Sequence, residues 1–172
     1  MGMTSEEAVF LRNYLVRQIE HERTTTQRVL EALPEERREY RPHTDARSAI
    51  ELAWHLANCE IWFLEGIIHG AFAPEHVRMP KHICTVRDVI AWYEKNVPGL
   101  ISEVKNLSPE QLTRRAELLG QSSYPAVTYL SALLVHTAHH RGQLAAYLRA
   151  MGSRVPSIYG GSADEPFRAA AH

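Results

Sequence analysis

Apolar residues recur at intervals of three and four along four long stretches of the chain, at about residues 4–34, 48–70, 85–104 and 123–152. This spacing places the apolar side chains on one face of an α-helix. The segments between these stretches show no convincing strand pattern. Four long helices, each with an apolar face, predict an all-α fold, a four-helix bundle in which the apolar faces meet.

The beginnings of the predicted helices carry capping signals. Thr4 with Glu7 and Ser48 with Glu51 have the spacing of a capping box, in which two side chains satisfy backbone N–H groups at a helix N-terminus. The sequence TVRD opens the third helix at Thr85. Three of the four helix starts are therefore predicted from local sequence as well as from periodicity.

The connection into the fourth helix is less regular. SPEQL, which begins at Ser108, predicts a short extra helical turn, and TRRAELLGQSSY is predicted to be irregular or briefly extended. We expect the fourth helix to begin around Ser123–Pro125 and to end at Gly152, which suits a C-cap. Residues 1–152 then form a single domain, and residues 153–172 form a tail that packs on the bundle and frays at its end.

Composition narrows the class of protein. The 172 residues carry a net charge of −1, which argues against a nucleic-acid binder. No apolar run reaches the length of a membrane span, and the first residues lack a signal-peptide pattern. Cys59 and Cys84 have neither metal-type spacing nor the pattern of a disulfide framework. We expect a cytoplasmic protein with reduced thiols and with no nucleic-acid or membrane partner.

Three histidines interrupt the apolar sequence of the fourth helix. His136 and His140 lie one turn apart on the stripe that carries the core leucines, so both side chains are expected to point into the bundle. This i, i+4 spacing lets two imidazoles reach one metal ion from one helix. His139 is rotated from the stripe by about 100°. Thr137 stands where a zincin protease has its glutamate, so that class is not supported.

A third inward-facing histidine lies on the second helix. His55 belongs to an apolar stripe, and if the second and fourth helices are neighbours it faces His136 and His140. Three neutral imidazoles then converge inside the bundle. Taken alone, a histidine in this position is more often an ordinary core histidine than a metal ligand. Cys59, one turn further along, either approaches the site or packs as a small buried hydrophobe.

Three segments resemble a known family. HTAHHRGQLAAYLRAMG resembles the fourth-helix signature of the DinB/YfiT-like superfamily, which consists of damage-inducible, metal-binding four-helix bundles and is distinct from the DNA polymerase that shares the DinB name. SAIELAWHLANCEIWFL resembles the second-helix signature, and YRPHTDARS resembles the segment before it. The resemblance extends to Gly152 and implies a divalent metal, commonly zinc or nickel, held by His55, His136 and His140.

Three protein ligands leave a coordination position open, which is typical of a catalytic metal site. An ion there either acidifies a bound water for hydrolysis or holds a small thiol as thiolate and directs it at an electrophile. The superfamily includes bacillithiol- and mycothiol-dependent transferases. The resemblance therefore favours a metal-dependent S-transferase that uses a low-molecular-weight thiol and acts on a small molecule. A metal-dependent hydrolase and a non-enzymatic metal-binding or stress-response module stay open as alternatives.

Two residues beside the three histidines are candidates for catalytic roles. His139 is expected to act as a general base or to orient a metal ligand, and Gln143 to hydrogen-bond a ligand or the substrate. The alternatives are packing on the flank of the helix for His139 and a satisfied core amide for Gln143.

Several large apolar residues lie at or beyond the edges of these stripes, namely Trp54, Ile61, Ile68 and Trp92. They either widen the core or form a second apolar face that contacts another chain. Because the family resemblance also implies dimerisation through helix faces, we expect a homodimer.

Overall fold

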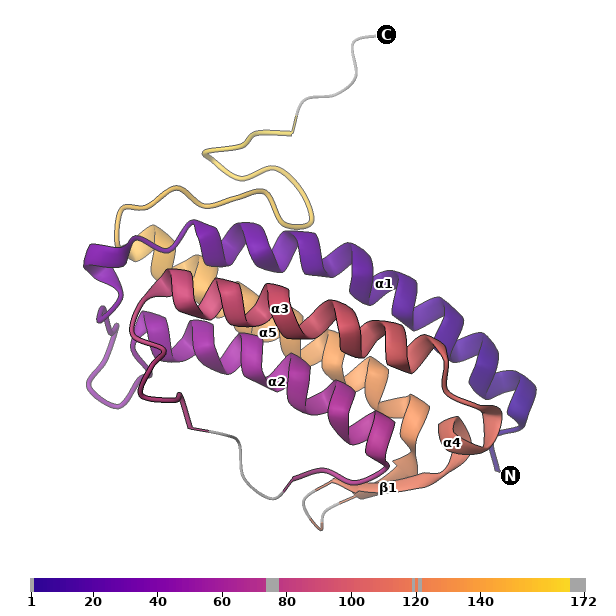
Figure 1. Cartoon of the computed structure of the whole chain (residues 1–172). Coiled ribbons are helices and arrows are strands. Elements are labelled where there is room, and N and C mark those ends of the chain that lie inside the picture. Colours follow the sequence, from indigo (N-terminus) through magenta and orange to yellow (C-terminus); the bar gives the residue numbers. More distant parts are fainter. Residues whose placement is uncertain (1, 74–77, 119, 121, 168–172) are drawn as a thin grey trace, which may run out of the picture.

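The computed structural model describes residues 2–73, 78–118, 120 and 122–167. Four long helices lie side by side: α1 (Ser5–Glu31), α2 (Ala49–His69), α3 (Val86–Lys105) and α5 (Tyr129–Ala150) (Figure 1). The elements between them are the 3-10 helices η1 (Glu35–Arg37) and η2 (Ala126–Thr128), the short helix α4 (Pro109–Thr113), and the strands β1 (Arg115–Leu118) and β2 (Ser122–Pro125). The predicted four-helix bundle with a short extra helical turn is confirmed.

The long helices surround one core. α2 packs on α3 and α5, and α1 packs on the same two helices, so α1 and α2 lie diagonally across the bundle from each other. Most residues of α2 are buried, which explains why its sequence is apolar on nearly every side. Trp54 and Ile61 are each only 5% exposed, so they belong to this core and not to a second apolar face. The homodimer stays a prediction.

Capping boxes begin α1, α2, α3 and α4. In each, a serine or threonine side chain accepts a backbone N–H three residues later, and the side chain of that later residue accepts the N-cap N–H. The pairs are Thr4–Glu7, Ser48–Glu51, Thr85–Asp88 and Ser108–Gln111. α2 ends at Gly70, whose φ of 71° lies in the left-handed region that glycine adopts without strain. These local signals predicted the starts of these four helices correctly.

The segment between α4 and α5, which was predicted to be irregular or briefly extended, forms an antiparallel hairpin whose pairing the sequence analysis did not predict. β1 pairs with β2 so that Ala116 lies opposite Tyr124. The prediction that the fourth helix begins around Ser123–Pro125 is wrong, because these residues pair with β1 and α5 begins only at Tyr129. Of the four residues in β1 only Ala116 is buried, so the alternation was too short to indicate a strand.

The chain after α5 returns over the bundle. Gly152, with a φ of 76°, follows the helix, and residues 153–167 cross over α1 (Figure 1). Glu165 pairs with Arg28 of α1, and Asp164 pairs with Arg149 of α5 at 2.6 Å. These ion pairs attach the tail to two helices. The predicted fraying concerns residues 168–172, which lie outside the described residues.

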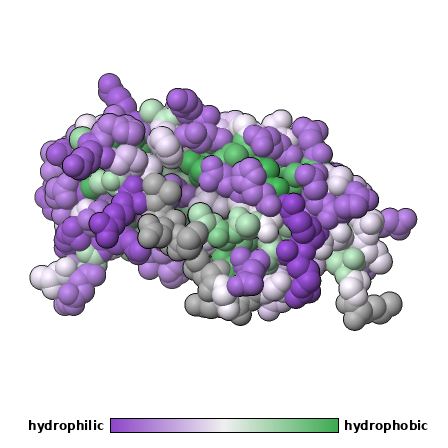
Figure 2. All heavy atoms as spheres, turned by 60° about the horizontal axis from the view of Figure 1, so that its bottom comes forward, coloured by the Kyte–Doolittle hydropathy of each residue, from purple (hydrophilic) through white to green (hydrophobic). Residues whose placement is uncertain are grey.

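Figure 2 shows the face of the molecule that lies at the bottom of Figure 1. Hydrophilic side chains cover most of this face and surround smaller groups of hydrophobic ones. Within the described ranges, no helix combines the length and the apolar character needed to cross a membrane.

Candidate metal centre

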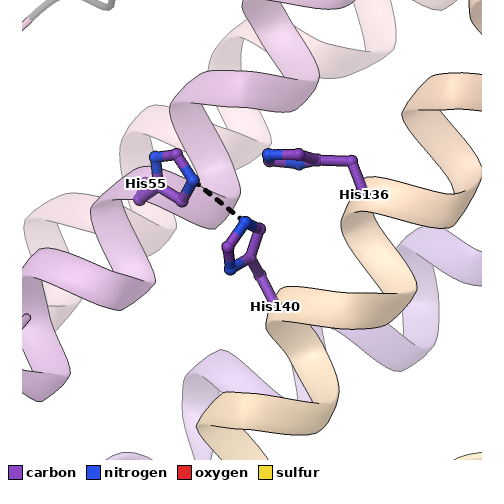
Figure 3. A group of neighbouring side chains, drawn as sticks. All are labelled: His55, His136 and His140. Atoms are coloured by element: carbon purple, nitrogen blue, oxygen red, sulfur yellow. Dashed lines mark hydrogen bonds between the residues drawn. The ribbon is translucent and has the colours of Figure 1, made fainter. Parts of the chain in front are cut away.

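Three histidines from two helices meet between α2 and α5 (Figure 3). His55 lies in the first half of α2, and His136 and His140 lie one turn apart on α5. The ring centroid of His55 is 5.2 Å from that of His136 and 4.4 Å from that of His140. The His136 and His140 centroids are 4.3 Å apart. The packing of α2 on α5 thus brings together the three histidines that the sequence analysis selected.

The spacing of the ring nitrogens fits one metal ion. Each histidine contributes a nitrogen that lies within 4.8 Å of the other two, and Nε2 of His55 is 3.1 Å from Nε2 of His140. Two nitrogens bound to one tetrahedral zinc ion, each at about 2.0–2.1 Å, are roughly 3.3 Å apart. The cluster can therefore hold a divalent ion with small side-chain movements. Three imidazoles suit zinc, nickel, copper or iron.

A chain of hydrogen bonds runs from His139 through Gln143 to His140. Gln143 Oε1 lies 2.8 Å from His140 Nδ1, and Gln143 Nε2 lies 3.0 Å from His139 Nε2. Because the amide oxygen accepts the proton on Nδ1, the lone pair of neutral His140 is on Nε2, toward His55. Gln143 therefore orients a candidate ligand, and the exposed His139 is connected to the cluster through Gln143.

The local environment of His140 favours its metal-binding form. Burial lowers the pKa of His140, and the hydrogen bond to Gln143 opposes this effect, while electrostatic interactions with His139 and Arg47 lower the pKa further. Metal binding requires a neutral imidazole. The lowered pKa therefore keeps His140 available as a ligand at a lower pH than an exposed histidine.

Cys59 is buried against the His55 ring. Its Sγ lies 3.4 Å from His55 Nδ1, and the residue is fully inaccessible to solvent. Burial raises the pKa of the Cys59 thiol to about 12, although the positive charge of Arg47 opposes this rise. Cys59 is therefore a neutral thiol near neutral pH, and it packs behind His55 as a small polarisable side chain.

Arg141, the residue after His140, anchors α5 to the rest of the bundle. Its side chain is 0% exposed, pairs with the carboxylate of Glu22 and donates to Thr26 Oγ1 at 3.2 Å. It also donates to the hydroxyl of Tyr159 in the tail. The network fixes the rotation of α5 against α1, which leaves the neighbouring histidines facing α2. The sequence analysis missed this network, because an arginine in a helical pattern ordinarily indicates a solvent-exposed face.

Aromatic side chains close one side of the cluster. The Phe63 ring lies 5.6 Å from the His136 ring, and Phe72 packs 6.1 Å from Phe63 and 4.7 Å from Tyr129. Gly66 makes this packing possible, because a Cβ there would lie 2.3 Å from a ring carbon of Phe72. The aromatic wall formed by Phe63, Phe72 and Tyr129 therefore restricts approach from the His136 side.

Two adjoining cavities provide access to the cluster from another side. A cavity of about 530 Å³ includes His55 in its wall and is otherwise lined by Arg47, Glu51, Trp54, Asn58, Arg78 and Met79. A second cavity of about 630 Å³ reaches Gln143, and Arg47 lines both cavities. A small molecule can therefore approach His55 and the partner of His140 past Arg47. Sequence periodicity gave no signal for Arg47 or Arg78, since both lie outside the helices.

A half-buried cluster of three histidines between two helices of a four-helix bundle defines this protein as a helical bundle with a candidate metal centre. The DinB family model matches residues 3–167, and the chain belongs to the DinB family.

Solved structures of DinB-like proteins share the fold. One, from Bacillus subtilis, has 23% sequence identity and a TM-score of 0.69, and the match covers 84% of this chain and 97% of that chain. Another, from Bacillus cereus, has 22% identity and a TM-score of 0.70, with 84% and 95% of the two chains covered. No functionally curated protein matches the chain.

Proposed function

We propose that this protein is a metal-dependent S-transferase that uses a low-molecular-weight thiol as its cosubstrate. In this proposal His55, His136 and His140 hold one divalent ion, with zinc or nickel as the first candidates. The observation that carries the proposal is the convergence of three imidazole nitrogens within 4.8 Å beside a cavity large enough for a small molecule. Three protein ligands leave a coordination position for an exogenous ligand.

A divalent ion in this position would lower the pKa of a bound thiol and keep its sulfur as a thiolate. The residues of the chain provide the surroundings: Gln143 orients His140, and the aromatic wall restricts water on one side. The thiol proton passes to solvent, and the sulfur forms a bond to an electrophilic carbon of the second substrate. The bond between that carbon and the leaving group breaks, and its electron pair departs with the leaving group.

The charges around the cluster support thiol transfer over hydrolysis. Hydrolysis at a metal centre is helped by a base that takes a proton from the attacking water. Among the described residues no carboxylate belongs to the metal-spaced group, and Glu51 in the adjoining cavity is paired with Arg41 at 3.0 Å. A thiolate needs no further base once it is formed, and His139, which is connected to the cluster through Gln143, can take the thiol proton and pass it to solvent. The positive charge of Arg47 favours an anion at this place.

Cobalt substitution tests the proposal. Cobalt-loaded protein is titrated with bacillithiol, mycothiol, glutathione and cysteine, and each thiol is then tested for metal-dependent transfer to monobromobimane. We expect sulfur-to-cobalt charge-transfer absorption, proton release and turnover with at least one thiol. We also expect His139→Ala to reduce turnover more than it reduces metal content.

Two other results would replace the proposal. If no thiol perturbs the cobalt spectrum while simple esters or amides are hydrolysed in a metal-dependent way, the protein is a hydrolase. If neither activity is found in metal-loaded protein, a non-enzymatic metal-binding module is the better account.

A further inference from the structure

The cavity beside His55 contains two arginines whose charges are not neutralised by described neighbours. Arg47 and Arg78 both line it, and neither side chain forms an ion pair or a hydrogen bond with another residue in the described ranges. The cavity also contains Glu51, but this carboxylate is engaged by Arg41 at 3.0 Å and by the backbone N–H of Ser48 at 2.8 Å. As far as the described residues are concerned, the two guanidinium groups are therefore available to a ligand.

The position of Arg47 connects these guanidinium groups to the metal centre. Arg47 lines both cavities, one of which includes His55 and the other Gln143. Its guanidinium charge therefore lies between the cavity at His55 and the cavity at Gln143, the partner of His140. Three neutral imidazoles bring no negative charge of their own, so an occupied centre and the two arginines together form a strongly positive pocket.

The rest of the cavity wall suits the carbon skeleton of a small molecule. Trp54 and Met79 contribute apolar surface, and Asn58 contributes an amide that can donate or accept a hydrogen bond. Guanidinium groups match the planar geometry of a carboxylate and can bind it through two parallel hydrogen bonds. The wall therefore combines an apolar surface with a cationic end.

We propose that Arg47 and Arg78 bind the carboxylate of a carboxylate-bearing thiol cosubstrate while its sulfur faces the histidine cluster. This inference rests on the proposed S-transferase function and adds the chemical class of the thiol. Arg47 and Arg78 are then specificity-determining residues that select acidic thiols over neutral and cationic ones. The cavity of about 530 Å³ has room for a thiol with one or more carboxylates next to His55.

A matched set of thiols tests the inference on cobalt-loaded protein. The probes are 3-mercaptopropionate, 2-mercaptoethanol and cysteamine, which are similar in size and carry a negative, no and a positive charge. Sulfur-to-cobalt absorption gives the dissociation constant of each for the wild type and for an Arg47→Gln/Arg78→Gln variant. Comparing the two proteins cancels the intrinsic differences between the thiols.

We expect the ratio of the 2-mercaptoethanol to the 3-mercaptopropionate dissociation constant to fall by about tenfold in the double variant, a size typical of charge-assisted hydrogen bonds at a partly exposed site. The dissociation constant of 2-mercaptoethanol should rise as well, because Arg47 also favours its thiolate, but by less than that of 3-mercaptopropionate. The control Arg87→Gln removes the same charge from the exposed surface of α3 and should leave the ratio unchanged.

The outcomes separate this inference from the proposed function. If the thiols bind but the ratio is the same in wild type and double variant, or if Arg87→Gln lowers it equally, the arginines do not select the carboxylate and the inference is wrong while the S-transferase proposal stands. If no thiol produces the absorption in wild-type protein, the S-transferase proposal fails, and the inference fails with it.

Discussion

Glu60 is a carboxylic acid in the core of the bundle, and replacing it should stabilise the protein at high pH. The residue is 2% exposed, and the hydroxyl of Tyr93 donates to its Oε2 at 3.0 Å. Burial raises the pKa of Glu60 to about 7, although the Tyr93 hydrogen bond and the positive charges of Arg141 and Arg23 oppose this rise. In the unfolded chain the same carboxyl has a pKa near 4.5.

The sign of the pH dependence follows from these two values. Between pH 4.5 and 7 the folded state holds a proton on Glu60 that the unfolded state has released, so the free energy of unfolding falls as the pH rises through this range. Well above pH 7 the wild-type protein has lost the whole contribution of this bound proton to its free energy of unfolding. The difference between a pKa of 4.5 and one of about 7 corresponds to about 3 kcal/mol.

Glu60→Gln removes this proton linkage while keeping an acceptor for the Tyr93 hydroxyl. Urea unfolding of metal-free protein, followed by circular dichroism, gives the free energy of unfolding for both proteins at about pH 5 and pH 8.5. We expect the stability of the variant relative to wild type to rise by about 2–3 kcal/mol between the two pH values. For the control Glu65→Gln, at an exposed position on the same helix, the stability relative to wild type should change by no more than about 0.5 kcal/mol between the two pH values. A Glu60→Gln difference that is equal at both pH values would refute the reasoning.

Three further predictions concern the support of the metal centre. Arg141→Met leaves the Glu22 carboxylate without its buried partner and should lower the free energy of urea unfolding by about 3–5 kcal/mol. Adding Glu22→Leu should recover part of that loss. A decrease below about 1 kcal/mol for Arg141→Met contradicts the anchoring role. Gln143→Leu keeps all three histidines but removes the hydrogen-bond acceptor at His140 Nδ1, so we expect the zinc affinity to weaken about 10- to 100-fold. A competition titration measures this affinity, and an unchanged value would contradict the role of Gln143. Zinc affinity of the wild type should fall as the pH drops through about 6, because protonated imidazoles cannot bind metal, and a constant affinity between about pH 7.5 and 5.5 would argue against histidine ligands.

The features that the sequence predicted well depend on local or periodic patterns. The capping boxes at Thr4, Ser48 and Thr85 involve residues three positions apart, so the backbone and side-chain partners are visible in a short window. His136 and His140 share a face because of helical periodicity alone. His55 required one further assumption, that α2 and α5 are neighbours, and this contact exists in the structure.

The features that were missed depend on contacts between distant segments. Thr26 is 0% exposed because Arg141, 115 positions away, reaches it across the core. The apolar pattern of α1 fades around Thr26 for this reason, and no local signal distinguishes it from a solvated face. Phe10 and Tyr14 also follow the apolar spacing of the first stretch, yet they are 71% and 49% exposed, because α1 turns its Ala8 and Leu15 face toward the bundle here.

The most direct test of the account is the metal content of purified protein. Three proteins are compared: the wild type, His136→Ala/His140→Ala, and the control His69→Ala/His82→Ala, which removes two exposed histidines outside the cluster. Each is loaded with zinc or nickel, desalted and measured by elemental analysis. Circular dichroism confirms that each variant keeps the helical fold. We predict about one ion per chain in wild type and control, and less than about a tenth of an ion per chain in the folded His136→Ala/His140→Ala variant. A folded His136→Ala/His140→Ala variant that retains the wild-type metal content would contradict the account.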